Sequence, residues 1–105
     1  MQIIFGKEYL RNLYQTGNSE DKKHRFQPQI VSKYIKVVDL MQSLPDVLAL
    51  RKYNSLHYEK MLGDKTELSS VRINDQYRIE FKEWINGTET VATICNIVEL
   101  SNHYK

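Results

Sequence analysis

The 105-residue sequence has little cysteine, proline or glycine and no long hydrophobic run. Its single cysteine, Cys95, excludes a disulfide within the chain, and its apolar neighbours favour a buried structural thiol over a nucleophile. No apolar run approaches the roughly 18 residues of a transmembrane helix. The N-terminus also lacks the charged and apolar regions of a signal peptide. We therefore expect a protein of the reducing cytoplasm, with no membrane partner.

The sequence also has little excess of one sign of charge over the other, because its formal net charge is only +2. Any surface that binds a polyanion would therefore be a local patch of defined shape, with a weaker diffuse field than a basic arm provides. The glycines stand apart, so there is no Gly-rich phosphate loop. The three histidines and the cysteine lack the spacing of a zinc site. We expect no metal and no cofactor.

The apolar content of 41% and charged content of 27% are ordinary for a soluble globular protein. At 105 residues the chain is long enough for one core, and we expect a single domain over residues 1–105. Most of the expected elements follow from apolar periodicity. They are a strand over 1–5, a helix over 7–15 ended by Gly17, a mobile polar connection over 17–25, a long helix from Pro28 to before Pro45, and a strand over 56–61.

The most informative stretch is Ser69 to Phe81, in which apolar and polar residues alternate on both sides of the polar segment 74–76. This pattern predicts a β-hairpin. Only a loop of odd length sets apolar residues against each other, with Val71 opposite Ile79. A second hairpin is predicted at Asn86-Gly87 by a type I′ turn signal, with a last strand over 91–100. A two-residue loop there sets Ile79 against Ile94, Phe81 against Ala92 and Arg78 against Cys95.

The first hairpin places Arg72 directly across from Arg78 on the face turned away from the apolar one. Like charges in this relation are mildly destabilising, so folding alone does not favour the pair. Two adjacent guanidiniums form a fork that suits a phosphate. The alternative is a pair of solvated arginines with Glu80 and Glu83 as partners, and the hairpin alone leaves both interpretations open.

The expected helices come first along the chain and the antiparallel strands follow. This order predicts an α+β fold, with two N-terminal helices packed on one face of a mainly antiparallel twisted sheet. The other face, with Arg72, Arg78 and either His57 or Tyr58, would stay uncovered. Such a cationic face suits metal-independent RNA cleavage, in which the ribose 2′-hydroxyl attacks its own phosphate. His57 and His103 are candidate proton carriers. The aromatic candidates for stacking on a base are Tyr58, Tyr77 and Tyr104.

The segment 70–79, Ser-Val-Arg-Ile-Asn-Asp-Gln-Tyr-Arg-Ile, is specific enough to compare with known proteins. In this segment the sequence resembles the HigB branch of the RelE/ParE toxin superfamily, which includes plasmid maintenance killer proteins. The similarity covers nearly the whole chain. Its other segments are 13–17, Gln27-Pro28-Gln29, Leu56-His57, 62–65 and His103-Tyr104.

The resemblance implies a RelE-like fold and a bacterial type II toxin, an endoribonuclease that cuts mRNA, usually in the ribosomal A site. It also implies a cognate helix-turn-helix antitoxin, through which operator DNA would be contacted only indirectly. By position, Arg72 and Arg78 match arginines that contact the scissile phosphate, and His57 matches a Leu-His position. Two other functions stay open, namely a ParE-like inhibitor of DNA gyrase and an inactive homologue that only binds antitoxin.

The C-terminal His103-Tyr104 corresponds to a family ending Asp-Tyr-His, with His and Tyr in the reverse order here. The identity of the general acid and base therefore stays open. Lys60 is a reserve candidate, because related toxins use lysines for proton transfer or charge. The residues that we expect to contact RNA are Tyr58, Lys60, Asn74, Tyr77 and Tyr104.

Overall fold

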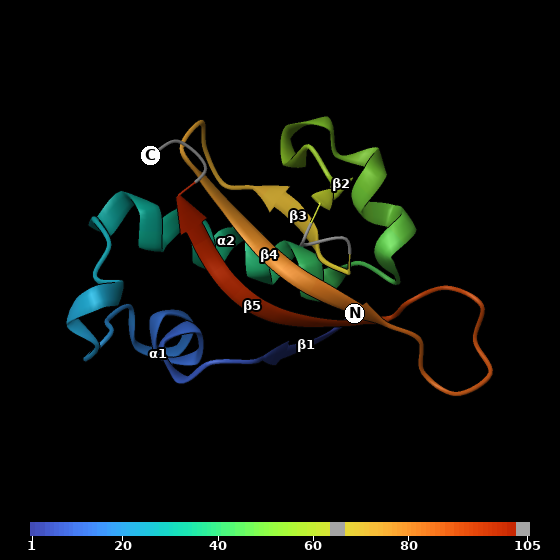
Figure 1. Ribbon diagram of the computed structural model, residues 1–105, viewed down its shortest axis with the longest axis horizontal. Coiled ribbons are helices and arrows are strands. Elements are labelled where there is room, and N and C mark those ends of the chain that lie inside the picture. Colours follow the sequence, from blue (N-terminus) through green and yellow to red (C-terminus); the bar gives the residue numbers. More distant parts are fainter. Residues whose placement is uncertain (64–66, 103–105) are drawn as a thin grey trace.

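The computed structural model describes residues 1–63 and 67–102. Strands β4 and β5 cross the centre of the molecule, and α1 and α2 lie behind and beside them (Figure 1). The elements are β1 (Gln2–Phe5), α1 (Glu8–Thr16), a 3₁₀ helix (Lys22–His24), α2 (Pro28–Ser43), two further 3₁₀ helices (Val47–Lys52 and Asn54–Leu56), β2 (Glu59–Lys60), β3 (Ser69–Arg72), β4 (Tyr77–Trp84) and β5 (Ile94–Asn102).

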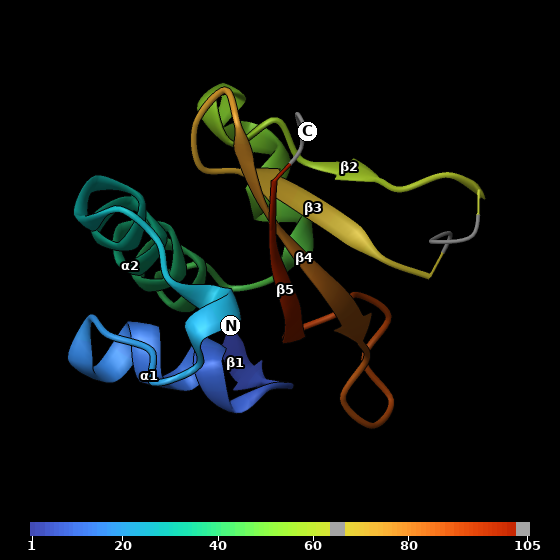
Figure 2. The same cartoon turned by 60° about the vertical axis from the view of Figure 1, so that its left-hand side comes forward.

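The strands form one sheet in the order β1-β5-β4-β3-β2. Strand β1 pairs with β5 in parallel, and the other neighbours are antiparallel. Both α-helices lie on the same face of this sheet (Figure 2). The predicted α+β class, with two N-terminal helices on one face of a mainly antiparallel sheet, is confirmed. No helix in the described part of the chain is long and apolar enough to cross a membrane.

Helix α2 supplies the main apolar stripe of the core, as its sequence predicts. Pro28 occupies the first turn, where its missing N–H would have no helical partner. Lys33 and Lys36 point to solvent. The buried residues of α2 are Ile30, Val31, Tyr34, Val37, Val38 and Met41, and Leu44 directly after the helix is also buried.

Gly17 ends α1 in a left-handed conformation with φ 77°, and its N–H donates to the carbonyl of Leu13. The segment after it, predicted to be a mobile connection, contains the 3₁₀ helix Lys22–His24. Asp21 caps that helix by accepting a hydrogen bond from the backbone N–H of Lys23. A local cap therefore gives structure to a segment that its polar composition does not reveal.

The predicted hairpin of β3 and β4 is confirmed residue by residue. Val71 is paired with Ile79, and both are fully buried. Arg72 is paired with Arg78 on the opposite face. We call β3, β4 and their connecting residues 73–76 the arginine hairpin.

The predicted pairing of β4 with β5 is wrong. Ile79 faces Leu100 instead of Ile94, Phe81 faces Ile97 instead of Ala92, and Arg78 faces Ser101 instead of Cys95. Residues 85–93 form a long connection in place of the two-residue turn. The position of β5 is also set by its second neighbour, because β1 pairs with residues 94–97.

The predicted strand over 56–61 is reduced to the two residues of β2. Leu56 ends a 3₁₀ helix, and His57 follows it in a left-handed conformation with φ 44°. A positive φ is uncommon outside glycine, although histidine adopts it more often than most residues do, and here it interrupts the extended chain. Leu56 still reaches the core, where its side chain is buried.

Cys95 is fully buried, as predicted, and its Sγ lies 3.7 Å from Sδ of Met1. Burial raises the pKa of the thiol to about 12. The thiolate is therefore disfavoured at neutral pH, which supports a structural role.

Candidate functional site

The arginine hairpin pairs Arg72 with Arg78 across two neighbouring strands, on one face of the sheet. Arg72 and Arg78 are half-buried, and the Arg72 side chain is 30% exposed. Ser70 and Glu80 lie on the same face but are almost fully buried. The prediction of an uncovered face is therefore wrong at Ser70 and Glu80, whose side chains are buried, and holds near the partly exposed arginines.

The residues of the turn orient both arginines. Arg72 forms an ion pair with Asp75, and Nη1 of Arg78 donates to the carbonyl oxygen of Asn74 at 3.4 Å. The Asn74 Oδ1 accepts from the backbone N–H groups of Gln76 and Tyr77, both at 2.8 Å. Asn74 therefore fixes the turn, and the turn fixes the two guanidiniums.

His57 and Tyr58 follow the 3₁₀ helix Asn54–Leu56, which lies close to β3. His57 is exposed and lines a hollow with Arg51, Tyr53 and Tyr58, whereas Arg72 lines another one. The Tyr58 ring packs 6.4 Å from that of Phe81, which lies on the face covered by the helices. Tyr58 was expected as an alternative to His57 on the uncovered face, and that placement is wrong.

The other predicted site residues have distinct surroundings. Tyr77 is half-buried against Phe26, edge to face, with ring centroids 5.6 Å apart. Its partner across the strands is Asn102, the last described residue. The predictions for His103 and Tyr104 lie outside the described residues.

A carboxylate that the sequence analysis did not single out for the site anchors two of the predicted residues. Glu83 accepts hydrogen bonds from the hydroxyls of Tyr58 and Ser69 and forms an ion pair with Lys60 at 3.1 Å. Burial raises the pKa of the Glu83 carboxyl, but the bonds from Ser69, Tyr58 and Lys60 outweigh it, so the pKa is lowered overall. Lys60 is therefore tied to Glu83 at the β2 edge of the sheet.

The lowered pKa of Glu83 predicts a loss of stability in acid. Its contribution is present above the unfolded-state value of about 4.3 and is lost as the pH falls through the lower folded-state value. We expect the acid-induced fall in the free energy of unfolding, measured by urea denaturation at a series of pH values, to be smaller in Glu83→Gln by about 1 kcal/mol. The exposed Glu59→Gln should retain the wild-type fall. An unchanged profile in Glu83→Gln would contradict this role.

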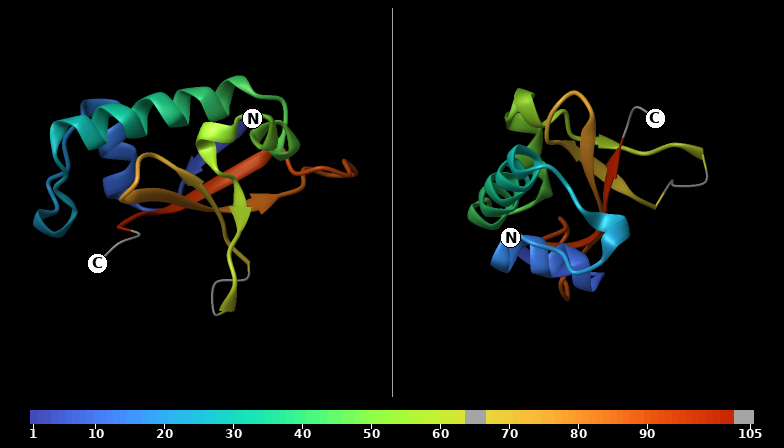
Figure 3. Two further views of the ribbon diagram at one scale, coloured as in Figure 1. Left: turned by 90° about the horizontal axis from the view of Figure 1, so that it is seen from above. Right: turned by 90° about the vertical axis from the view of Figure 1, so that its left-hand side faces the viewer.

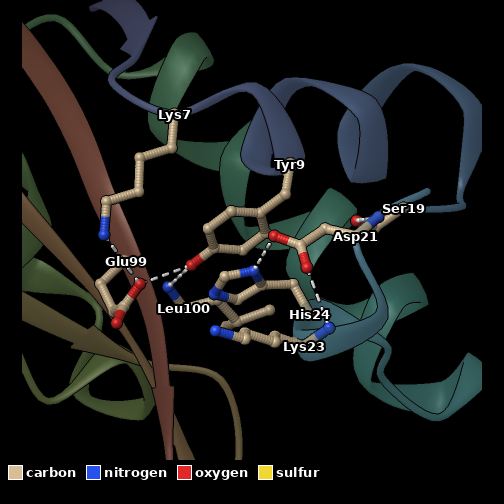
Figure 4. Close-up of polar contacts among 8 residues, drawn as sticks. All are labelled: Lys7, Tyr9, Ser19, Asp21, Lys23, His24, Glu99 and Leu100. Atoms are coloured by element: carbon tan, nitrogen blue, oxygen red, sulfur yellow. Dashed lines mark hydrogen bonds and ion pairs between the residues drawn. The ribbon is translucent and has the colours of Figure 1, made fainter.

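A second polar cluster fixes the end of β5 that faces Arg78 (Figure 4). The Tyr9 hydroxyl donates to Oε1 of Glu99 at 2.6 Å and accepts from the backbone N–H of Leu100 at 3.1 Å. His24 stacks on the Tyr9 ring at 3.7 Å. Burial and the hydrogen bond to Glu99 raise the pKa of Tyr9.

The Tyr9 cluster sits at a β-bulge. Glu80 is paired with Glu99 but Phe81 with Ile97, so β5 has one extra residue at this point. The bulge changes the alternation of β5, which lets both Ile97 and Leu100 face the core. The remaining residues therefore set Ser101 across from Arg78.

Removal of the Tyr9 hydroxyl should destabilise this end of β5. We expect Tyr9→Phe to lower the free energy of unfolding by about 1–3 kcal/mol, because the buried N–H of Leu100 loses its acceptor. Tyr14→Phe is the matched control on the same helix, since its hydroxyl bonds Asp39 at the exposed surface. Urea denaturation of both variants measures the difference. Equal losses would show that Tyr9 does not secure the bulge.

Comparisons with known proteins agree with this architecture. Residues 4–96 match the family model described as RelE-like toxin of type II toxin-antitoxin system HigB. The Toxin HigB-1 of Vibrio cholerae serotype O1 (strain ATCC 39315 / El Tor Inaba N16961) is 28% identical over 91 residues, which cover 83% of this chain and 87% of that protein.

The fold is also similar to a solved structure, a YoeB/ParE toxin from Agrobacterium tumefaciens, with a TM-score of 0.60. The match covers 99% of this chain and 100% of that chain at 14% identity, so it supports the fold alone. The family model spans most of the sequence, so the assignment to a family does not depend on the structural match. The protein belongs to the RelE-like HigB family of type II toxins.

Proposed function

We propose that this toxin is a metal-independent endoribonuclease that cuts mRNA in the ribosomal A site and so arrests translation in the bacterial cytoplasm. The observation that supports this proposal most directly is the pairing of Arg72 with Arg78 across two rigid strands. Folding gains nothing from this pairing of like charges. A phosphate between the two guanidiniums would turn their repulsion into a joint attraction.

The ion pair of Arg72 supports the same role. Its partner Asp75 is 92% exposed, so the pair contributes little to stability and exchanges readily. In our proposal a phosphate oxygen of the RNA replaces the Asp75 carboxylate. Arg78 would donate from the other side, since its hydrogen bond to the Asn74 carbonyl is long at 3.4 Å.

The reaction needs a base, an acid and cations at the phosphate. In the proposed cleavage the ribose 2′-oxygen loses its proton and bonds to phosphorus, and the bond from phosphorus to the 5′-oxygen breaks as that oxygen is protonated. Arg72 and Arg78 would stabilise the charge that develops on the phosphoryl oxygens. His57 and His103 are the candidate proton carriers. Asn74, Tyr77 and Tyr104 remain the proposed RNA contacts, whereas Glu83 holds Tyr58 and Lys60 at the β2 edge of the sheet.

The family implies a cognate antitoxin, and we infer that it is the helix-turn-helix protein predicted above. Operator DNA would then be reached only through that antitoxin. While the antitoxin is bound, the toxin would be held inactive, and its loss would release the nuclease.

The product of the reaction tests the proposal. Purified protein added to translating ribosomes should give mRNA fragments that end in a 2′,3′-cyclic phosphate or 3′-phosphate, detected by end-specific ligation and sequencing. Intact message at one toxin per ribosome would refute a ribosome-dependent nuclease. Inhibition of DNA supercoiling by gyrase, with the message intact, would point to the ParE-type activity instead.

A further inference from the structure

Four aromatic rings form a row at the end of the sheet where the arginine hairpin turns. We call it the aromatic row, and it consists, in order, of His24, Tyr9, Phe26 and Tyr77. His24 stacks on Tyr9 with ring centroids 3.7 Å apart and planes that differ by 9°. Phe26 lies 6.5 Å from Tyr9 and meets Tyr77 edge to face at 5.6 Å. The row therefore links the segment 21–26 with α1 and with β4.

The segment 21–26 turns its rings toward the protein and its charges toward solvent. His24 and Phe26 are half-buried, whereas the lysines and the arginine of the segment are exposed. Asp21 holds this arrangement, because it caps the 3₁₀ helix and its Oδ2 lies 2.8 Å from Nδ1 of His24. The left view of Figure 3 places the connection between α1 and α2 at the same end of the molecule as the loop of the arginine hairpin and the end of β5.

The first two rings of the row support the end of β5. The hydroxyl of Tyr9 accepts from the backbone N–H of Leu100, which directly precedes Ser101. Ser101 is the strand partner of Arg78. His24 lies flat against the Tyr9 ring, as Figure 4 shows. The stack restricts the tilt of the Tyr9 ring and therefore the position of the strand end that the hydroxyl holds.

The last two rings support the turn of the arginine hairpin. The carbonyl of Tyr77 accepts from the N–H of Ile73 at 3.0 Å, and its own N–H donates to Oδ1 of Asn74 at 2.8 Å. Arg78 follows Tyr77 directly, and its guanidinium donates to the carbonyl of Asn74. Phe26 packs on the Tyr77 ring and so restricts the same backbone that orients the Arg78 side chain.

We propose that the aromatic row positions Arg78 for the cleavage, with Phe26 and His24 as positioning residues. This role rests on the proposed function, because it serves the same reaction. Phe26 is central to it, since its ring contacts both Tyr9 and Tyr77. Without that ring, the turn and the end of β5 would lose their common support. A misplacement of about 1 Å can cost a reaction roughly a hundredfold in rate, so a small movement of Arg78 would be felt.

Replacing Phe26 with leucine tests this role in the reaction. Phe26→Leu keeps an apolar side chain but removes the ring, and it should lower kcat for mRNA cleavage on translating ribosomes about tenfold, with KM raised less than about threefold. Phe26→Tyr keeps the ring and should cleave at close to the wild-type rate. Phe5→Leu is the matched control, because Phe5 is also half-buried and packs on Tyr14 of α1 at 5.5 Å. It should leave kcat unchanged.

Amide hydrogen exchange followed by mass spectrometry measures the support of the hairpin without any reaction. Phe26→Leu should exchange faster than wild type over 73–78 and over 100–102, and Phe5→Leu should not. If Phe26→Leu does not fold, His24→Ala takes its place, because the His24 side chain is 29% exposed. His24→Ala should lower kcat about threefold, and His24→Phe, which keeps a ring on Tyr9, should restore it.

Three results would overturn the proposal. They are equal kcat in Phe26→Leu and Phe5→Leu, a change confined to KM, and unchanged exchange over both stretches. A rise in KM that Lys22→Ala/Lys23→Ala shares would make the segment 21–26 an RNA contact instead. If wild type cuts no mRNA, the proposed function fails, and exchange alone then decides. A selective rise in Phe26→Leu would support the row as the brace of the arginine hairpin, and no rise would refute it.

Discussion

Replacing Arg78 with alanine should lower the rate of mRNA cleavage on translating ribosomes about a hundredfold or more. A guanidinium aimed at the charge that develops on the phosphate contributes most in the transition state. The fold should be retained, because Arg78 is half-buried and its hydrogen bond to Asn74 is long. The rate of message cleavage and the growth of cells that express the variant measure the effect.

Two further substitutions separate charge from geometry. Arg78→Lys keeps the charge but loses the bidentate fork, and it should recover only part of the activity. Arg11→Ala removes an arginine that pairs with Glu8 on the exposed face of α1, and it should leave cleavage unchanged. If Arg78→Ala cleaves at the wild-type rate, Arg78 has no part in the reaction.

Replacing Phe81 with alanine should have the largest effect on stability. Phe81 is fully buried at the β-bulge, between its strand partners Ser69 and Ile97. Truncation of a buried phenylalanine costs about 3–5 kcal/mol, because a cavity remains. A domain of this size has a total stability of roughly 5–15 kcal/mol, so the variant would be close to unfolding.

The matched control for Phe81→Ala is Trp84→Ala on the same strand. Trp84 is 42% exposed, so part of its ring is already in water and its loss should cost less than that of Phe81. Urea denaturation at neutral pH gives both values. A cost below about 1 kcal/mol for Phe81→Ala would mean that the bulge region repacks around the gap.

The arginine hairpin could be predicted because all of its determinants are local. Apolar residues alternate with polar ones on both sides of a short polar loop, and only one facing of the strands buries Val71 against Ile79. The position of Arg72 across from Arg78 then follows without knowledge of the rest of the chain. The long helix α2 was predictable for the same reason, since Pro28 marks its start, an apolar stripe runs along it and Pro45 follows its end.

The pairing of β5 could not be predicted from alternation. The observed partner of Ile79 is Leu100, six residues beyond the predicted Ile94, whereas that of Phe81 is Ile97, five residues beyond the predicted Ala92. The two shifts differ because of the β-bulge, which the alternation of apolar residues does not reveal. The Asn-Gly signal then decided the prediction, although Gly87 lies within a long connection. Only the tertiary pairing of β1 with β5, which joins the two ends of the chain, selects the observed alignment.

The supporting clusters of the site also escaped prediction. Tyr9 and Glu99 are 90 positions apart, and Tyr58 and Glu83 are 25 apart. No local pattern marks such partners before the fold is known. His57 was predicted on a strand, but its backbone is left-handed and it follows a 3₁₀ helix directly.

The lengths of the strands bear on the behaviour of the toxin at high concentration. The sheet ends in β1, with four residues, and β2, with two, while the inner strands β4 and β5 have eight and nine. A short edge strand offers few free backbone groups for a further strand to pair with. We therefore expect the liberated toxin to resist amyloid-like polymerisation.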